Sequence, residues 1–211
     1  MPINTPKKNC QLCPRLSEYR AANKSENPSW FNGAVPAFGE ITAELLIVGL
    51  APGVKGANRT GRPFTGDHAG DLLYATLKKF GFSSGTYNAT KDDGLKLKNC
   101  RITNAVRCVP PQNKPIGSEA KNCRPFLHSE IQNLKKLKVI VSLGRVSHEN
   151  ILTALTIKKS EYPFAHAAKH QVAKNLTMID SYHCSRYNTN TGRLTEKMFE
   201  DVFSIAKSIL D

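Results

Sequence analysis

Six cysteines in a chain of 211 residues are the first candidates for chemistry, at positions 10, 13, 100, 108, 123 and 184. Cys10 and Cys13 form a Cys-x-x-Cys pair, whose spacing lets one short turn present both sulfurs to a single ion. The N-terminal sequence MPINTPKKNCQLC has no apolar core of a signal peptide, so we expect an intracellular protein. In that setting the pair favours a metal site or redox chemistry over a disulfide, and it needs partners from elsewhere in the chain.

A glycine-rich segment, GLAPGVKGANRTGRPFTGD at residues 49–67, is the second candidate. It follows the apolar run ELLIVGL, as a phosphate-binding loop would follow a strand. However, it has neither the Gly-Lys-Ser/Thr ending of a P-loop nor G-x-G-x-x-G, which disfavours nucleoside triphosphate binding. Taken alone, Phe64 in this segment is typical of a core residue and Asp67 of a helix N-cap.

The elements that must position these residues alternate between strand and helix. Short apolar, β-branched runs predict strands at 44–50, 101–106, 138–143 and 176–182, and near-continuous runs of this kind favour a parallel sheet. Helical spacing predicts helices at 67–80, 118–137, 146–156 and 196–210, with Ser118 and Thr195 as caps. The sequence therefore predicts a single α/β domain over 1–211, three layers deep, around a central four-stranded parallel sheet.

Two segments lie outside this pattern. Residues 1–40 are polar and rich in turn residues, so we expect an irregular segment that wraps over the core and brings Cys10 and Cys13 with it. Residues 87–98 predict an exposed connection.

Most of the concentrated Gly, Pro, Asn, Arg and His follows the predicted strands. The four segments are GLAPGVKGANRTGRPFTGD, TNAVRCVPPQNKP, SLGRVSHEN and DSYHCSRYNTNTGRLT. Because ligands of open parallel sheets bind outside the carboxyl ends of the strands, we expect these segments to converge on one cleft.

The charge of the chain points to a polyanionic partner. Thirty Lys and Arg against seventeen Asp and Glu give a net charge of +13, spread along the sequence. Nucleic acid is the commonest intracellular polyanion, and we expect it to be the partner. No apolar run approaches the roughly 20 residues of a membrane span.

In order along the chain, CQLCPRL, AVPAFGE, GLAPGVKGANRTGRPFTGD, TNAVRCVPPQNKP and YHCSRYNTNTGRLT resemble the motifs of the family 5 uracil-DNA glycosylases. This is the iron–sulfur branch of the uracil-DNA glycosylase superfamily, found in bacteria and archaea. The resemblance implies the superfamily fold and base-excision repair. The enzyme would flip out uracil, and other deaminated bases such as hypoxanthine, hydrolyse the N-glycosidic bond and leave an abasic site. It also implies a monomer in the cytoplasm of a prokaryote, associated with the nucleoid.

The resemblance assigns residues to the base. Phe64 would stack on the flipped base, and Asn104 would read its edge through an amide that both donates and accepts. His183 would hydrogen-bond to the negative charge that develops on the leaving base. Gly49 and Ala51 would lie beside the base. Without the family, a buried Asn at a strand end is more typical of one that satisfies backbone groups.

The group that activates water is less directly implied. The related family 4 motif carries a Glu where this chain has Leu50, which cannot polarise water. We therefore expect Asp67 to take the role, with Asp71 one helical turn later as the second choice. Asn58 could also position a water.

The family also implies a cofactor. Cys10, Cys13, Cys108 and Cys123 match the ligands of a [4Fe–4S] cluster, and a four-cysteine zinc site is the rival interpretation, which the spacing leaves open. Its role would be structural, tying the N-terminal segment to residues 108–123. Cys100 and Cys184 are left as ordinary thiols.

One motif departs from the family pattern. The usual His-Pro-Ser is His183-Cys184-Ser185 here, and loss of the proline's fixed torsion could loosen the loop or shift His183. The polar, basic residues 185–193 that follow suit a loop that enters DNA, with Tyr187 as a candidate wedge.

Basic and hydroxyl residues flank the motifs and are candidates for contacts to DNA phosphates. They are Arg59, Arg62, Ser185, Arg186 and Arg193, with Lys55 and Lys114 beside them. Two other functions remain open on the sequence: a DNA-binding module with an inactive pocket, and an iron–sulfur redox protein that uses the four cysteines alone.

Overall fold

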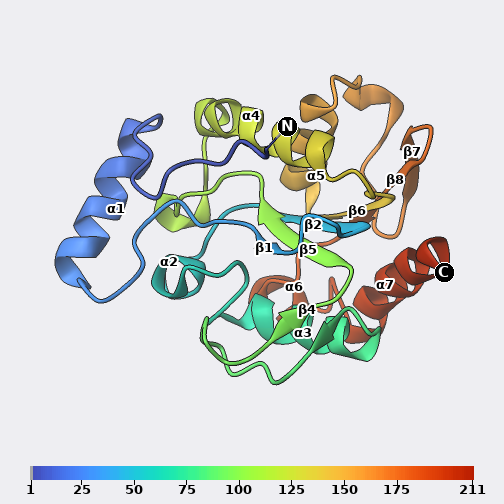
Figure 1. The fold of residues 1–211 in the computed structure, drawn as a ribbon, viewed down its shortest axis with the longest axis horizontal. Coiled ribbons are helices and arrows are strands. Elements are labelled where there is room, and N and C mark those ends of the chain that lie inside the picture. Colours follow the sequence, from blue (N-terminus) through green and yellow to red (C-terminus); the bar gives the residue numbers. More distant parts are fainter. Residues whose placement is uncertain (1) are drawn as a thin grey trace.

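The protein is described by a computed structural model covering residues 2–211, and its centre is a six-stranded sheet in the order β1-β5-β2-β6-β8-β7 (Figure 1). The four inner strands run parallel: β5 (Cys100–Asn104), β2 (Leu45–Gly49), β6 (Val139–Leu143) and β8 (Leu176–Ser181). All four were predicted from the sequence. The expected total of four strands is wrong, because β1 (Phe38–Gly39) and β7 (Lys169–Ala173) add antiparallel edges.

Both faces of the sheet are covered by helices, which gives the predicted three layers. In Figure 1, α4 (Gly117–Asn133) and α5 (Arg145–Ala154) lie above the sheet, and α3 (His68–Lys79) and α7 (Glu196–Leu210) lie below it. Each side has its own buried apolar cluster. The strands β2, β6 and β8 contribute to both, whereas β5 contributes only to the cluster on the α3 side. Strands buried on two faces need apolar residues at successive positions, which explains their uninterrupted hydrophobic runs.

Local signals placed most helix ends correctly. The Thr195 Oγ1 caps α7 by accepting from the Met198 N–H at 3.2 Å, as predicted. Ser118 is not the N-cap, because α4 begins at Gly117 and its N-cap residue is Ile116. The Ile116 N–H donates to the Glu119 carboxylate at 2.9 Å. The shorter elements are α2 (Ala57–Thr60), α6 (Arg186–Asn190), η1 (Pro111–Asn113), η2 (Lys159–Glu161), β3 (Ser83–Ser84) and β4 (Lys96–Leu97).

The expectation of an irregular N-terminal segment is wrong for residues 14–26, which form helix α1 (Pro14–Glu26). Its buried face consists of Leu16, Arg20 and Asn23, at helical spacing. Because two of these three are polar, the hydrophobic pattern that normally reveals a helix is absent. Arg20 donates to the Lys8 carbonyl at 2.8 Å, so the polar face holds the preceding turn instead of an apolar core.

The connection at residues 87–98 is not simply exposed. It contains β4, and the Asp93 carboxylate accepts from the Arg62 guanidinium at 2.8 and 2.7 Å. The side chains of Arg62 and Asp93 are 5% and 0% exposed. Arg62 also lies over the rings of Phe38, Tyr74 and Tyr87, so this ion pair fastens the connection to the core.

None of the helices in residues 2–211 is both long and apolar enough to span a membrane.

We expect Asp93→Asn to destabilise the fold, because it leaves the Arg62 charge buried without a counter-charge. Breaking a buried pair in this way costs about 3–5 kcal/mol. Arg62 holds the pKa of the Asp93 carboxyl well below its usual range, so the pair's contribution is complete above the ordinary Asp pKa and is lost as the pH falls below it.

Urea unfolding at neutral pH measures this change. Asp92→Asn is the matched control, since its carboxylate is 78% exposed and pairs only with an exposed Lys91. A change of less than about 0.5 kcal/mol is expected there. Equal effects of the two substitutions would contradict a stabilising role for the Arg62 pair.

Candidate active site

The carboxyl ends of the inner strands open into a hollow of about 580 Å³. Its lining comes from the loop after β2, the start of α3, the turn after β5 and the segment after β8. These residues are Leu50, Ala51, Gly53, Lys55, Gly66, Asp67, His68, Ala69, Asn113, His183, Ser185 and Arg186. Three of the four predicted segments therefore converge here. The fourth, after β6, lines an adjoining hollow of about 250 Å³ that shares Leu50 and His183.

A smaller hollow of about 40 Å³ continues inward from the first. It shares Ala51, Asp67 and His183 with the outer hollow and adds Phe64 and Asn104. The rings of Phe64 and His183 face each other with centroids 6.1 Å apart and planes inclined by 29°. Four of the side chains expected to handle the base and the water, Phe64, Asn104, His183 and Asp67, are therefore brought to one place.

Gly49, the last residue of β2, makes this arrangement possible. A Cβ there would lie 2.4 Å from the Asn104 Oδ1 and 2.5 Å from the Phe64 Cζ, closer than real contacts allow. Gly49 is thus behind the inner hollow and does not line it, whereas Ala51 lines both hollows. Only a residue without a side chain lets Asn104 and Phe64 meet.

Phe64 combines a core position with a place at the site. It is 7% exposed and belongs to the apolar cluster under α3, yet its ring also forms a wall of the inner hollow. Its φ of 51° is in the left-handed region, which costs energy for a residue with a side chain. Gly70 leaves room for this turn, because a Cβ there would lie 1.9 Å from the Phe64 carbonyl oxygen.

Asn104 carries an unsatisfied group. It is 3% exposed at the end of β5, and within residues 2–211 its Oδ1 finds no hydrogen-bond partner. A buried carbonyl left without a partner costs about 1–3 kcal/mol. An unpaired amide beside a hollow is the state expected of a group that waits for a ligand.

The two carboxylate oxygens of Asp67 have different surroundings. As the N-cap of α3, its Oδ1 accepts from the Gly70 N–H at 3.3 Å. Its Oδ2 faces Gly53 and Gly56, where added Cβ atoms would lie 3.0 and 2.1 Å away. Burial raises the pKa of the Asp67 carboxyl, which makes its ionised form a stronger base.

His183 follows β8 and is neutral at physiological pH. Burial, with no hydrogen bond or charge opposing it, lowers the pKa of its imidazole to about 4. Its backbone carbonyl accepts from the Asn188 Nδ2 at 2.8 Å, which ties the residue to α6. A neutral imidazole can still donate one N–H to a ligand.

Cys184 takes the place of the usual proline as a packing residue. It is completely buried in the apolar cluster under α3, and its thiol lies 3.5 Å from the Ala69 carbonyl. Ser185 then caps α6, with its Oγ accepting from the Asn188 N–H at 3.4 Å. The loop after His183 is therefore held by contacts on both sides, without the torsion that proline would fix.

The candidate phosphate contacts separate into two groups. Ser185, Arg186 and Lys55 line the outer hollow, and Arg193 lines the adjoining one, where its guanidinium lies 4.8 Å from the centre of the Tyr182 ring. The prediction for Arg62 is wrong, because its guanidinium is buried and used by Asp93.

Arg59 lies on the rim of the site without lining either hollow. Its Nε donates to the Lys55 carbonyl at 2.8 Å, which steadies the loop. Tyr187, the candidate wedge, is 72% exposed on α6. Lys114 is exposed just beyond η1.

The two alternatives to Asp67 lie outside the hollows. Asn58 is fully buried, and its Nδ2 donates to the Asn32 Oδ1 at 3.0 Å, so it joins the loop to the N-terminal segment. The Asn58 Oδ1 is buried and has no hydrogen-bond partner within residues 2–211, so a role in positioning a water stays a prediction. Asp71 is exposed on α3, and its negative charge contributes to the raised pKa of Asp67.

Two residues of the outer hollow were missed by the sequence analysis. Asn113 in η1 has a φ of 56° and an exposed side chain. His68, the first residue of α3, lies with its Nε2 3.0 Å from the Thr189 Oγ1 of α6. Asn113 lies in a segment that follows a predicted strand, and His68 comes directly after another such segment. Their closeness to these segments could have identified them from the sequence.

The four predicted metal ligands lie together where the N-terminal segment packs against residues 106–123. Cys13, Cys108 and Cys123 are buried in one cluster, with Cys10 partly buried against it. Burial, together with smaller contributions from the neighbouring cysteines, raises the pKa of the Cys108 thiol to about 12. Such a group of thiols becomes thiolate only if a positive centre compensates the charge. Cys100 and Cys184 are buried elsewhere, in the cluster under α3.

Comparison with known proteins agrees with this geometry. A family model described as the uracil DNA glycosylase superfamily matches residues 36–207. The type-5 uracil-DNA glycosylase of Thermus thermophilus is 42% identical over 207 residues, covering 95% of this chain and 93% of that protein. The type-5 enzyme of Pyrobaculum aerophilum is 35% identical, covering 92% and 86%. A type-4 uracil-DNA glycosylase of Sulfurisphaera tokodaii is 30% identical, covering 82% and 74%.

The chain therefore belongs to the uracil-DNA glycosylase superfamily, and its relatives place it in the type-5 family. The resemblance found in the motifs is confirmed over nearly the whole chain.

The low pKa of His183 can be measured by NMR of the imidazole ring. We expect the ring to stay neutral down to about pH 5, because burial lowers its pKa to about 4. Protonation of His183 near pH 6.5 would contradict its desolvation.

Proposed function

We propose that this protein is a uracil-DNA glycosylase that removes uracil from DNA by hydrolysing the N-glycosidic bond, as a first step of base-excision repair. The observation that carries the proposal is the inner hollow, where Phe64, Asn104, His183 and Asp67 meet. The names of the type-5 relatives support the same activity.

Recognition of the base rests on Asn104 and Phe64. The Asn104 amide has a buried oxygen that is still unsatisfied, and uracil offers an N3–H that can donate to it, while the amide NH₂ can donate to the O4. The Phe64 ring supplies a flat apolar surface for the flipped base. The hollow of about 40 Å³ is smaller than a base, so the base occupies part of the outer hollow as well.

His183 stabilises the leaving group. As the glycosidic bond breaks, the base carries away the bonding electrons and its oxygen becomes negative. A neutral imidazole carries one N–H that it can donate to this oxygen, and a desolvated donor is worth more than one in water. The packing of Cys184 and the bond from Asn188 keep the ring in place.

Asp67 orients and deprotonates the attacking water. The sugar becomes oxocarbenium-like in the transition state, so a carboxylate nearby also stabilises its positive charge. The Asp67 Oδ2 is the oxygen that the helix cap leaves available, and its raised pKa suits a general base. Leu50, at the position of the family 4 glutamate, lines the hollow but has no group that binds water.

The outer surface suits DNA. Lys55, Arg186 and Arg193 surround the two hollows and would contact phosphates, while the exposed Tyr187 of α6 would fill the position that the flipped base leaves. The outer hollow has a volume of about 580 Å³, which leaves room for larger deaminated bases such as hypoxanthine. A monomer acting at the nucleoid of a prokaryotic cell stays a prediction, and the relatives from bacteria and archaea agree with the prokaryotic part.

The cysteine group would hold a [4Fe–4S] cluster, with Cys10, Cys13, Cys108 and Cys123 as ligands. The cluster would neutralise four buried thiolates and join the turn before α1 to the start of α4. The Asn122 Nδ2, 3.6 Å from the Cys13 Sγ, would donate to a ligating sulfur. None of the steps of base excision requires the cluster.

The spacing of the sulfurs disfavours zinc. Four sulfurs around one zinc ion lie about 3.8 Å apart, since each Zn–S bond is about 2.3 Å. Among residues 2–211, the only group of three or more candidate ligands within 4.8 Å is His148, His170 and Asp180, so the cysteines are spread more widely. A wider arrangement suits a cluster of four irons.

Single-turnover excision from a uracil-containing oligonucleotide, followed by alkaline cleavage of the abasic site, tests the function. We expect Asp67→Asn to slow excision about 10²–10⁴-fold, the range for loss of a general base. Asn still caps a helix, so the fold should be kept. In the wild type, excision should slow as the pH falls through the raised pKa of Asp67.

Asp71→Asn is the matched control, because it removes an exposed carboxylate one helical turn away. Its rate should stay within about twofold of the wild type. If Asp67→Asn retains the wild-type rate, the water is activated elsewhere. If the wild-type protein releases neither uracil nor hypoxanthine from single or double strands, it is a binding module and not a glycosylase.

Metal analysis of anaerobically purified protein tests the cofactor. We expect about four iron atoms and four sulfides per chain, lost together with the brown colour in Cys108→Ala. Cys100→Ala is the control, since that thiol is buried in the apolar cluster under α3 and should not affect iron content. One zinc and no iron would contradict the cluster.

A further inference from the structure

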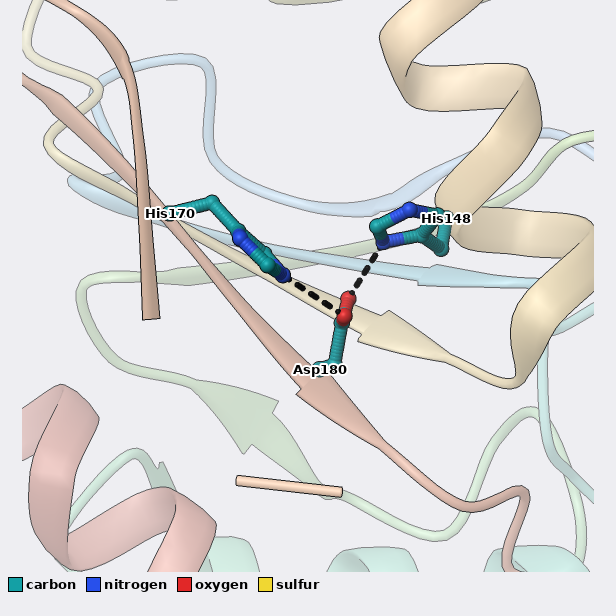
Figure 2. A group of neighbouring side chains, drawn as sticks. All are labelled: His148, His170 and Asp180. Carbon is teal, nitrogen blue, oxygen red and sulfur yellow. Dashed lines mark hydrogen bonds and ion pairs between the residues drawn. The ribbon is translucent and has the colours of Figure 1, made fainter. Parts of the chain in front are cut away.

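A second group of metal-type ligands lies on the α5 side of the sheet, away from the cysteines. Figure 2 shows the imidazoles of His148 on α5 and His170 on β7 pointing at the carboxylate of Asp180 on β8. The His148 Nδ1 lies 2.8 Å from the Asp180 Oδ1, and the His170 Nε2 lies 2.9 Å from the Oδ2. None of the three lines the hollows of the proposed catalytic site.

The group is almost completely enclosed. The side chains of Asp180, His148 and His170 are 0%, 2% and 10% exposed. An ionised carboxylate at such a place is costly unless positive charge compensates it. Within residues 2–211, no Lys or Arg forms a salt bridge with Asp180, so the compensation must come from the imidazoles or from an ion between them.

The hydrogen bond made by the Nε2 of His148 bears on which positive group compensates Asp180. Its Nε2 lies 2.9 Å from the Tyr162 carbonyl, which can only accept, so this nitrogen carries a hydrogen. In the neutral ring the Nδ1 is then an acceptor, and it faces a carboxylate oxygen, which is also an acceptor. Two acceptors at 2.8 Å need a positive centre to hold them together.

The arrangement matches the usual surroundings of a metal-binding histidine. Such a histidine donates its second N–H to a backbone carbonyl or a carboxylate, which fixes the tautomer and aims the other nitrogen at the ion. The Ser142 Oγ likewise donates to the Asp180 Oδ1 at 2.6 Å and orients the carboxylate. All three ligand atoms lie within 4.8 Å of one another, so small shifts would place them around one ion.

We infer that His148, His170 and Asp180 bind one divalent transition-metal ion of the zinc type, in addition to the metal at the cysteines. Two imidazole nitrogens and one carboxylate oxygen suit Zn²⁺ and disfavour Mg²⁺ and Ca²⁺, which prefer oxygen. A hollow of about 210 Å³, lined by His148 and Tyr162 among others, lies beside the group. The ion would fasten the edge strand β7 and helix α5 to β8.

Zinc uptake by the purified protein, with its cysteine site already occupied, tests this inference. After equilibration with Zn²⁺ and removal of free metal, we expect about one zinc per chain in the wild type and at least tenfold less in His170→Gln. His170 is the choice because it lies on the edge strand and is the most exposed of the three. His128→Gln is the matched control, since that histidine contacts only the Ala154 carbonyl, at 2.7 Å, and should leave the uptake unchanged.

Thermal unfolding gives a second readout. Zinc that binds only the folded state raises Tm, so added Zn²⁺ should raise it in the wild type and in His128→Gln but not in His170→Gln. In the wild type alone, cobalt substituted at this site should show ligand-field bands without sulfur-to-metal charge transfer, which separates it from cobalt at the cysteines. This readout remains available if the variant fails to fold.

Equal zinc uptake by the wild type and His170→Gln, or a wild type that takes up no zinc and shows no zinc-dependent Tm, would overturn the inference. A proton, not a metal, would then join His148 to Asp180. Excision of uracil plays no part in these measurements, so they are independent of the proposed function.

Discussion

The absence of a side chain at Gly49 is the constraint on which the catalytic pocket depends. The carboxyl ends of β2 and β5 are neighbours in the sheet, so Asn104 and the loop after β2 must share a narrow space. A single Cβ at Gly49 would meet both the Asn104 amide and the Phe64 ring. Because this space is left open, the ring and the amide can form two walls of one pocket.

The pocket in turn requires groups that would be unfavourable elsewhere. Phe64 keeps a left-handed backbone, Asn104 keeps a buried oxygen without a partner, and burial moves the pKa of Asp67 upward and that of His183 downward. Each of these costs stability, and together they fit the proposed site, which requires a base, a neutral donor and an amide.

Both polar and apolar contacts attach the N-terminal segment to this core: the Val35 N–H donates to the Arg107 carbonyl at 2.7 Å, and Leu16 and Ala34 pack in the cluster that contains the cysteines. Arg107 is 2% exposed and donates to Glu130 of α4, and Glu130 also accepts from Arg101 at 2.7 Å. Arg20 of α1 reaches back to the Lys8 carbonyl, beside the buried cysteines. Because the four cysteines come from both parts of this cluster, a metal centre there would add a further link between the N-terminal segment and the core.

Sequence by itself determined the inner strands, three of the helices to within two residues, and the set of segments at the strand ends. These features follow from local rules: hydrophobic runs, helical spacing and the geometry of parallel sheets. It missed α1, whose buried face carries Arg20 and Asn23, and it missed the two edge strands, because short edge pairing leaves little periodic signal.

Only the tertiary structure decided the use of individual side chains. Arg62 and Arg186 are both basic residues beside a motif, yet one is buried against Asp93 and the other lines the hollow. Asn58 and Asn104 are both buried amides with an unpaired oxygen, but Asn104 lines the inner hollow, whereas the Asn58 Nδ2 donates to Asn32. His148, His170 and Asp180 are far apart in the chain and carry no motif. Which partner a polar group meets depends on long-range packing, and no local pattern of the sequence encodes that.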